Sequence, residues 1–180
     1  MIRFAALAAL ALAGCSAPAF AEDAQCFQNE TALVIAQTRT DEAGTDILVR
    51  APAKGKIKCE YEEREGDWII GSPGDPLWYE ALAGKFLVLT RSTGPDGDIV
   101  IYDLAIREKL VDEPADDEIV VTEDAVTYWQ RIASGTADNC DRFAEYSEMG
   151  LGAVVAEERV LDLASGTIKQ TGQSRCSSTQ

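Results

Sequence analysis

The sequence contains no histidine among its 180 residues. This absence excludes Ser-His-Asp and Cys-His catalysis, zinc or copper sites built on imidazole, and a histidine pH switch. Bond-making chemistry would have to use carboxylates, lysine, tyrosine, serine or threonine, and no catalytic motif of those residues is present. We therefore expect a protein without catalytic residues, without a metal centre and without a cofactor.

Basic residues are scarce, at 16 Lys and Arg against 31 Asp and Glu. Arg3 is the only charged residue among the first 21, so residues 22–180 carry 15 basic and 31 acidic side chains, a formal charge of −16. Nucleic acids and anionic membrane surfaces are bound through basic residues, so neither is an expected partner. A charge of this sign attracts a cationic partner, such as a basic protein or enzyme, and it also serves solubility alone.

The sequence also has no apolar stretch of the roughly 20 residues that a membrane-spanning helix needs. The apolar run at residues 4–13 follows Arg3 and is typical of a signal-peptide core. Leu12-Ala13-Gly14-Cys15 then resembles the lipobox of bacterial lipoproteins, whose cysteine is acylated, and Ala19-Phe20-Ala21 matches an ordinary secretory cleavage site. We predict an export signal over residues 1–21 and a single β-rich domain over residues 22–180.

Either cleavage site places the domain in the periplasm or the outer envelope. We favour a lipid anchor on Cys15 over a soluble form, and that lipid would be the only attachment to a membrane. Both outcomes expose the remaining cysteines to an oxidising compartment.

No C-x-x-C motif occurs, which argues against a thioredoxin-like redox function. Four cysteines remain after Cys15, and two disulfides in any of three pairings are the expected arrangement. We favour Cys26–Cys59 and Cys140–Cys176, because each closes a local segment. The spacings of 33, 81 and 36 residues lack the close pairs of a four-thiolate zinc site.

Short apolar runs of strand length dominate the domain, and turns rather than helical crossovers connect them. The clearest hairpin joins residues 85–91 to residues 98–104 through Pro95-Asp96-Gly97, a strong turn signal. Residues 77–83 fit a strand or a helical turn, residues 112–118 an acidic, proline-broken loop, and residues 172–180 a polar tail. The other expected strands are 31–37, 46–50, 57–62, 67–70, 109–111, 119–122, 126–131, 153–163 and 167–171.

One helix is expected over residues 138–149, with Asp138 or Asn139 as the N-cap and Gly150 as the stop. The pattern as a whole predicts a mainly β fold: an antiparallel β-sandwich or a partly open β-barrel with one short helix.

The most acidic part of the chain is the candidate binding surface. It has the charge of a divalent-cation site or of a docking face for a cationic partner, although its spacing does not match an EF-hand. The plainer interpretation is a solvated loop whose charges discourage strand pairing. Its members are Asp112, Glu113, Asp116, Asp117, Glu118, Glu123 and Asp124.

Two smaller features have a structural explanation beside the functional one. Asp96 and Asp98 could form a weak calcium site or an acid/base pair, but we favour the explanation that they belong to a hairpin turn, whose convex tip leaves carboxyl groups in water. Trp78 and Tyr79 follow Pro76 in a loop rich in breakers, so among the aromatic residues they are the candidates for an exposed recognition surface. Packing in a β core is the usual role of such residues.

Three functions remain open. The first is a non-catalytic envelope protein that binds a basic or other protein partner. The second is a carboxylate-dependent hydrolase of envelope glycans, which needs two acids in a cleft and at least one raised pKa. The third is a structural envelope lipoprotein.

Overall fold

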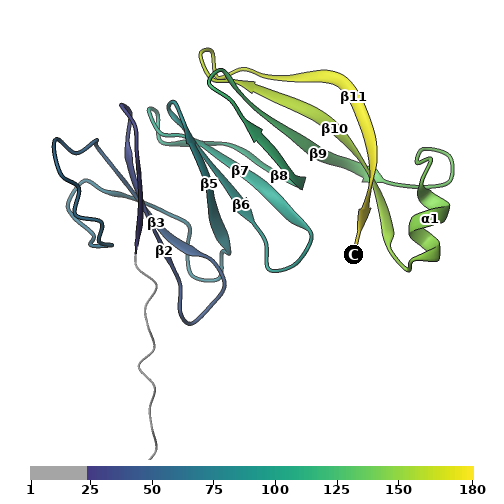
Figure 1. The fold of residues 1–180 in the computed structure, drawn as a ribbon, viewed down its shortest axis with the longest axis horizontal. Helices are drawn as coiled ribbons and strands as arrows, with labels where there is room; N and C mark the ends of the chain where they lie inside the picture. The colour runs from purple at the N-terminus through teal and green to yellow at the C-terminus, as the bar shows by residue number, and fades with distance from the viewer. Residues whose placement is uncertain (1–23) are drawn as a thin grey trace, which may run out of the picture.

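The computed structural model describes residues 24–180, and the predicted export signal, Cys15 included, lies outside the described residues. The chain forms two antiparallel sheets with one short helix and two disulfides, a sandwich-like and mainly β architecture (Figure 1). The predicted fold class is confirmed. Within residues 24–180 no helix has the length and apolar character required to cross a bilayer.

Consecutive strands are mostly neighbours in the sheets, because short turns connect them. The first sheet has the order β1-β2-β3-β4, and the second has the order β11-β10-β9-β8-β7-β6-β5. The elements are β1 Gln25–Gln28, β2 Leu33–Thr38, β3 Thr45–Arg50, β4 Trp68–Ile70, β5 Leu77–Ala83, β6 Phe86–Arg91, β7 Gly97–Asp103, β8 Glu108–Val121, β9 Ala125–Ser134, α1 Phe143–Glu148, β10 Gly152–Asp162 and β11 Ile168–Thr179.

Strands β6 and β7 are buried on both faces. On one face, Leu87, Leu89 and Val100 pack against Val34 and Ile47 of the first sheet, and this contact is the core of the sandwich. Strands buried on both sides read as continuous apolar runs instead of alternating ones. The predicted hairpin over residues 85–104 has this pattern.

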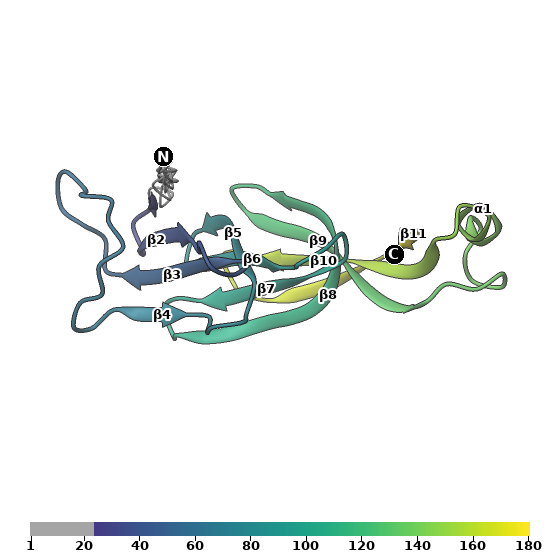
Figure 2. The same cartoon turned by 90° about the horizontal axis from the view of Figure 1, so that it is seen from below.

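The second core forms because the seven-stranded sheet curls over itself. Phe86 and Ile101 of β6 and β7 share one cluster with Val126 of β9 and Leu161 of β10. A Cβ placed on Gly166, in the turn between β10 and β11, would lie only 3.3 Å from the Phe86 ring. Since four steps in strand order separate β6 from β10, only a curled sheet brings these groups together (Figure 2).

Strand β8 bends at its acidic centre. Ala115 pairs with Gln130 of β9, and Ile119 pairs with Tyr128, so four steps along β8 face two steps along β9. The two extra residues form a bulge, a device that bends a strand and increases its twist. The prediction of a loop over residues 112–118 was therefore wrong, because this acidic segment belongs to a strand that β7 and β9 flank.

The first disulfide attaches a long irregular segment, residues 51–67, to the outer face of the first sheet. Cys26 and Cys59 are bonded with their Cα atoms 5.7 Å apart, as predicted. Ile57 and Tyr61 of this segment pack on a cluster of the first sheet that includes Leu48. The predicted strand at 57–62 is absent, because its alternating pattern reflects packing on one side without a partner strand.

The second disulfide joins the helical region to the last strand. Cys140 and Cys176 are bonded with Cα atoms 5.3 Å apart, which confirms the favoured pairing. The predicted helix is present, but it is shorter than expected and is preceded by turns. Each disulfide closes a loop that stabilises the fold by about 3–4 kcal/mol in the chain-entropy treatment.

Two further assignments are resolved by the sheet. Residues 77–83, ambiguous in sequence, form β5. The predicted polar tail over residues 172–180 is mostly strand, because β11 continues along β10 as far as Thr179. The residues of this segment do not alternate between apolar and polar, so the sequence gives no sign of a strand. The backbone hydrogen bonds to β10 determine its conformation.

Candidate functional site

The acidic bulge of β8 separates two adjoining clefts in the curled sheet. One cleft, of about 200 Å³, opens toward β5–β7 and the other, of about 270 Å³, toward β11. Ala115, Asp116 and Asp117 line both. We call the two clefts together the acidic groove.

The first cleft is lined by acids and apolar residues. Four acidic residues, Glu80, Asp98, Asp116 and Asp117, lie around it, together with Ile99, Ile119, Thr90 and Ser92. No lysine or arginine is among its lining residues. Glu80 and Asp117 are exposed and form no ion pair within residues 24–180. This side of the groove therefore has uncompensated negative charge.

The second cleft contains an arginine that comes from far along the chain. Arg175 of β11 donates from Nη2 and Nε to one carboxylate oxygen of Asp116, at 2.7 and 3.0 Å, and it also pairs with Glu118. Its guanidinium lies 4.3 Å from the ring centre of Trp129, a cation–π distance. Burial lowers the pKa of Arg175, but the hydrogen bonds to Glu118 and Asp116 outweigh it and raise the pKa.

A second arginine, Arg131 of β9, joins the bend of β8 to the start of β7. Its side chain is only 12 % exposed. It donates to the backbone carbonyls of Gly97 and Ala115 and lies 3.1 Å from an oxygen of Asp96. A buried guanidinium that closes hydrogen bonds to three groups fixes their relative positions.

Asp96 ties the hairpin between β6 and β7 to the end of β11. Its carboxylate accepts hydrogen bonds from the Thr179 hydroxyl at 2.5 Å and from the Gln180 backbone N–H at 2.9 Å. These two donors, with Arg131, lower the pKa of Asp96 against a smaller effect of burial. Asp98, the other acid of this hairpin, contacts Arg91 at 3.1 Å, so the two carboxylates have different partners.

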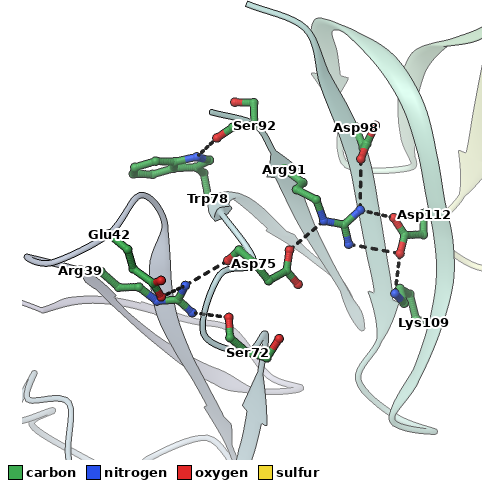
Figure 3. Close-up of polar contacts among 10 residues, drawn as sticks. All are labelled: Arg39, Glu42, Ser72, Asp75, Trp78, Arg91, Ser92, Asp98, Lys109 and Asp112. Atoms are coloured by element: carbon green, nitrogen blue, oxygen red, sulfur yellow. Dashed lines mark hydrogen bonds and ion pairs between the residues drawn. The ribbon is translucent and has the colours of Figure 1, made fainter. Parts of the chain in front are cut away.

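Arg91 is the centre of a polar network that joins β6, β7 and β8 to residues 71–76, the connection between the two sheets (Figure 3). It binds Asp75 at 2.8 Å, Asp98 and Asp112, and Lys109 also contacts Asp112. The hydrogen bond from Arg91, helped by Lys109 and opposed by partial burial, lowers the pKa of Asp112 to about 2. Asp112 is therefore an ionised partner within the fold.

Arg39 binds the other side of the same connection between the sheets. It donates to the carbonyls of Asp75 and Ser72 at 3.1 and 3.2 Å and pairs with Glu42 at 2.9 Å (Figure 3). Gly44 packs against this connection so closely that a Cβ there would lie 2.9 Å from Pro76 Cα, which only glycine permits. Arg39 and Arg91 thus hold the two sheets in register at their connecting loop.

The structure divides the seven predicted acidic residues into three groups. Asp112, Asp116 and Glu118 are in ion pairs. Asp117 lines the groove, and Glu113 is exposed on β8. Glu123 and Asp124 lie at the turn between β8 and β9 and line neither cleft. Groups of three or more side chains suited to a metal ion are absent from residues 24–180.

The two predicted recognition aromatics are engaged inside the molecule. The Trp78 indole N–H donates to the carbonyl of Ser92 at 3.0 Å. Tyr79 stacks on Phe27 with ring centres 3.6 Å apart, across the two sheets. Both rings are half-buried, and burial raises the pKa of Tyr79. We therefore place the candidate site at the acidic groove.

Sequence reasoning missed Arg131, Arg175 and Glu80 because their strands are distant along the chain. Arg175 and Asp116 are 59 residues apart. The one available signal was the rarity of basic residues, which makes each arginine a candidate partner for a cluster of acids.

Family models, curated proteins and solved structures were compared with the chain, and none of them matches it.

The acidic groove is suited to binding positive charge. The carboxyl groups with displaced pKa values, among them Asp96 and Asp112, are displaced downward by hydrogen bonds and basic neighbours. A general acid needs the opposite displacement. Ionised carboxylates beside apolar walls suit an ammonium or guanidinium group carried on an aliphatic stem.

Proposed function

We propose that the protein is an exported binding module whose acidic groove receives a lysine- or arginine-rich segment of a basic partner protein. The observation that carries this proposal is the cleft around Glu80 and Asp117, two exposed acids that form no ion pair within residues 24–180 and whose cleft has no basic lining residue. The formal charge of −16 over residues 22–180 would speed the encounter with a cationic partner.

The compartment is part of the proposal. The two disulfides indicate an oxidising environment outside the cytoplasm. We propose the periplasm or the outer envelope, with a lipid on Cys15 as the anchor. Intact-mass measurement of the protein from its host tests this directly: an acyl group on Cys15 supports the anchor, and a mature chain that begins after Ala21 excludes it.

The binding proposal is tested with a fluorescein-labelled deca-lysine peptide followed by fluorescence anisotropy. We expect binding at low salt that weakens strongly between about 10 and 150 mM salt, as the Debye length falls from about 30 to about 8 Å. A deca-glutamate peptide should not bind. Equal binding of both peptides, or no binding of deca-lysine, would remove the proposal.

A matched pair of variants locates the site. The double change Glu80→Gln/Asp117→Asn removes two charges from the groove and should weaken deca-lysine binding by roughly threefold to tenfold. The double change Glu123→Gln/Asp124→Asn removes the same charge from a turn outside the groove and should alter binding less than about twofold. Equal effects of the two doubles would show that only the overall charge matters.

The two other functions have less support. A glycan hydrolase needs a carboxyl with a raised pKa, and the groove's Asp96 has a lowered one. A purely structural lipoprotein would not discriminate between the two double variants. Cys15→Ala would release a structural lipoprotein from the membrane, and it would leave the peptide binding proposed here unchanged.

A further inference from the structure

Two arginines, Arg131 and Arg175, line the second cleft of the groove, and Arg175 is the one that comes from β11. Arg175 contacts Asp116 and Glu118, which line the second cleft, and it is itself a lining residue of that cleft. Two residues further along β11, the Ser177 hydroxyl donates to the same oxygen of Asp116 at 2.6 Å. The last part of β11 thus fills the positions that a partner's basic side chain would take.

The residue between these two contacts is Cys176, which is bonded to Cys140. The disulfide sits in a small core of its own with Tyr146 and Ala153. The Tyr146 hydroxyl lies 3.5 Å from the Cys176 carbonyl. The six-residue helix beside it is too short to be stable alone, so the disulfide is a main attachment of this region.

The end of β11 is held by one neighbouring strand only, because residues 174–179 pair with β10 and β11 lies at the edge of the sheet. Its pairing with β10 shifts between Glu157 and Arg159, where two steps on β10 face four steps on β11. Gly172 lies in this bulge with φ of +86°, a left-handed conformation. The strand after the bulge is an edge strand on which no residue is fully buried. Its position therefore depends on the β10 ladder, the polar contacts and the disulfide.

We propose that Arg175 is a built-in occupant of the acidic groove, held there by the Cys140–Cys176 disulfide, and that reduction of this bond opens the groove to a cationic partner. The inference rests on the proposed binding function and adds a form of regulation to it. The reductant is a dithiol, small or protein-borne, and a cleft of about 650 Å³ that both cysteines line is its path of approach.

The exchange is balanced in two steps. A thiolate of the dithiol attacks one sulfur of the disulfide, which forms a mixed disulfide and releases the other cysteine as a thiolate that takes up a proton. The second thiol of the dithiol then attacks the mixed disulfide. The dithiol loses two electrons and two protons and becomes a disulfide, and Cys140 and Cys176 become thiols. Without the cross-link only the ladder with β10 and the polar contacts hold the end of β11, and in the proposed opening the Arg175 side chain leaves Asp116 and Trp129.

The other disulfide is the matched control. Cys26–Cys59 holds residues 51–67 on the outer face of the first sheet, away from β8 and β11 (Figure 1). Deca-lysine binding is compared in the wild type, Cys140→Ser/Cys176→Ser and Cys26→Ser/Cys59→Ser. We expect Cys140→Ser/Cys176→Ser to bind deca-lysine about three- to tenfold more tightly, because the competing ion pairs of Arg175 are lost. Cys26→Ser/Cys59→Ser should change binding by less than twofold. Equal change in both, or none in the first, would overturn the proposal.

Arg175→Gln tests the same idea with both disulfides intact. It removes the internal cation, so it should tighten deca-lysine binding by about the same factor, and further reduction with a dithiol should add less than twofold. If Arg175→Gln binds no better than the wild type, the occupant role is wrong even where the cysteine variants fold poorly.

Trp129 fluorescence separates this proposal from the binding function. Loss of the Arg175 contact should shift the emission of the reduced protein, and Trp129→Phe should abolish that shift. A shift without any deca-lysine binding would reject the proposed partner class but keep the disulfide-controlled movement. Binding without a shift would reject the movement and keep the binding function.

Discussion

Strands β6 and β11 belong to the same sheet, but different forces hold them. Four consecutive residues of β6, from Phe86 to Leu89, have no solvent exposure. No residue of β11 is fully buried, and its side chains contact Asp116 and Asp96 through hydrogen bonds and ion pairs. Apolar burial is insensitive to salt and mild acid, whereas exposed ion pairs weaken with both. The β11 side of the molecule is therefore the side that solution conditions can change.

The largest loss of stability is expected from a change in the buried strand β6. Phe86→Ala should lower the free energy of unfolding by about 3–5 kcal/mol, because it leaves a cavity between β6, β9 and β10. Urea denaturation measures it, with Ile168→Ala of β11, 37 % exposed, as the control at under about 1 kcal/mol. Similar losses in the two variants would contradict the contrast between the strands.

An intermediate loss of stability is expected at Arg131, a buried arginine whose side chain connects β8 to the start of β7. Arg131→Ala should cost about 2–3 kcal/mol, since two backbone carbonyls and the carboxylate of Asp96 lose their donor. Arg142→Ala removes an exposed ion pair with Glu145 and is the matched control, with little change in stability expected. A loss for Arg131 no larger than the loss for Arg142 would show that the buried network does not hold the bend of β8.

The smallest loss of stability is expected at Asp112, a partly exposed carboxylate. The pKa of Asp112 is about 2 in the folded protein, below its ordinary value of 3.8, so its ion pairs stabilise the fold above pH of about 4. That stabilisation is lost as the pH falls from about 4 to about 2. Asp112→Asn should cost about 1 kcal/mol near neutral pH, after allowance for solvent screening. The difference from the wild type should vanish by about pH 2.

This last prediction is checked by urea denaturation of the wild type and Asp112→Asn across the acid range. A difference that stays constant down to low pH would mean that packing, and not the charge of Asp112, accounts for it. Glu113→Gln, on the neighbouring exposed residue of β8, is the control and should change little at any pH.

Local patterns predicted most of the strands because each records which face is buried. The hairpin over residues 85–104 was confirmed for that reason. Both disulfide pairings were confirmed because each joins cysteines that close a local segment. The pattern at residues 57–62 failed, because an irregular segment packed on a sheet buries alternate side chains just as a strand does. The segment over residues 172–179 failed in the opposite sense, because a polar edge strand needs only a backbone partner.

The candidate site was predictable only in part. The sequence located the run of acids at residues 112–118, but it did not distinguish Asp117, which lines the groove, from Asp112, which is bound to Arg91. Partners of a side chain in a sheet come from strands whose order and register depend on contacts across the whole chain. A local pattern carries no record of them.

The amino-acid sequence by itself determined the acidic charge, the mainly antiparallel β architecture and the pairing of cysteines close in sequence, since these follow from composition, strand length and chain connectivity. Only the tertiary structure decided that the second sheet curls at the bulge of β8 and brings Arg175 to Asp116 across 59 residues. The physical reason is that the two extra residues in β8 bend the sheet. The packing of Phe86 with Leu161 stabilises this bend only when the whole chain is folded.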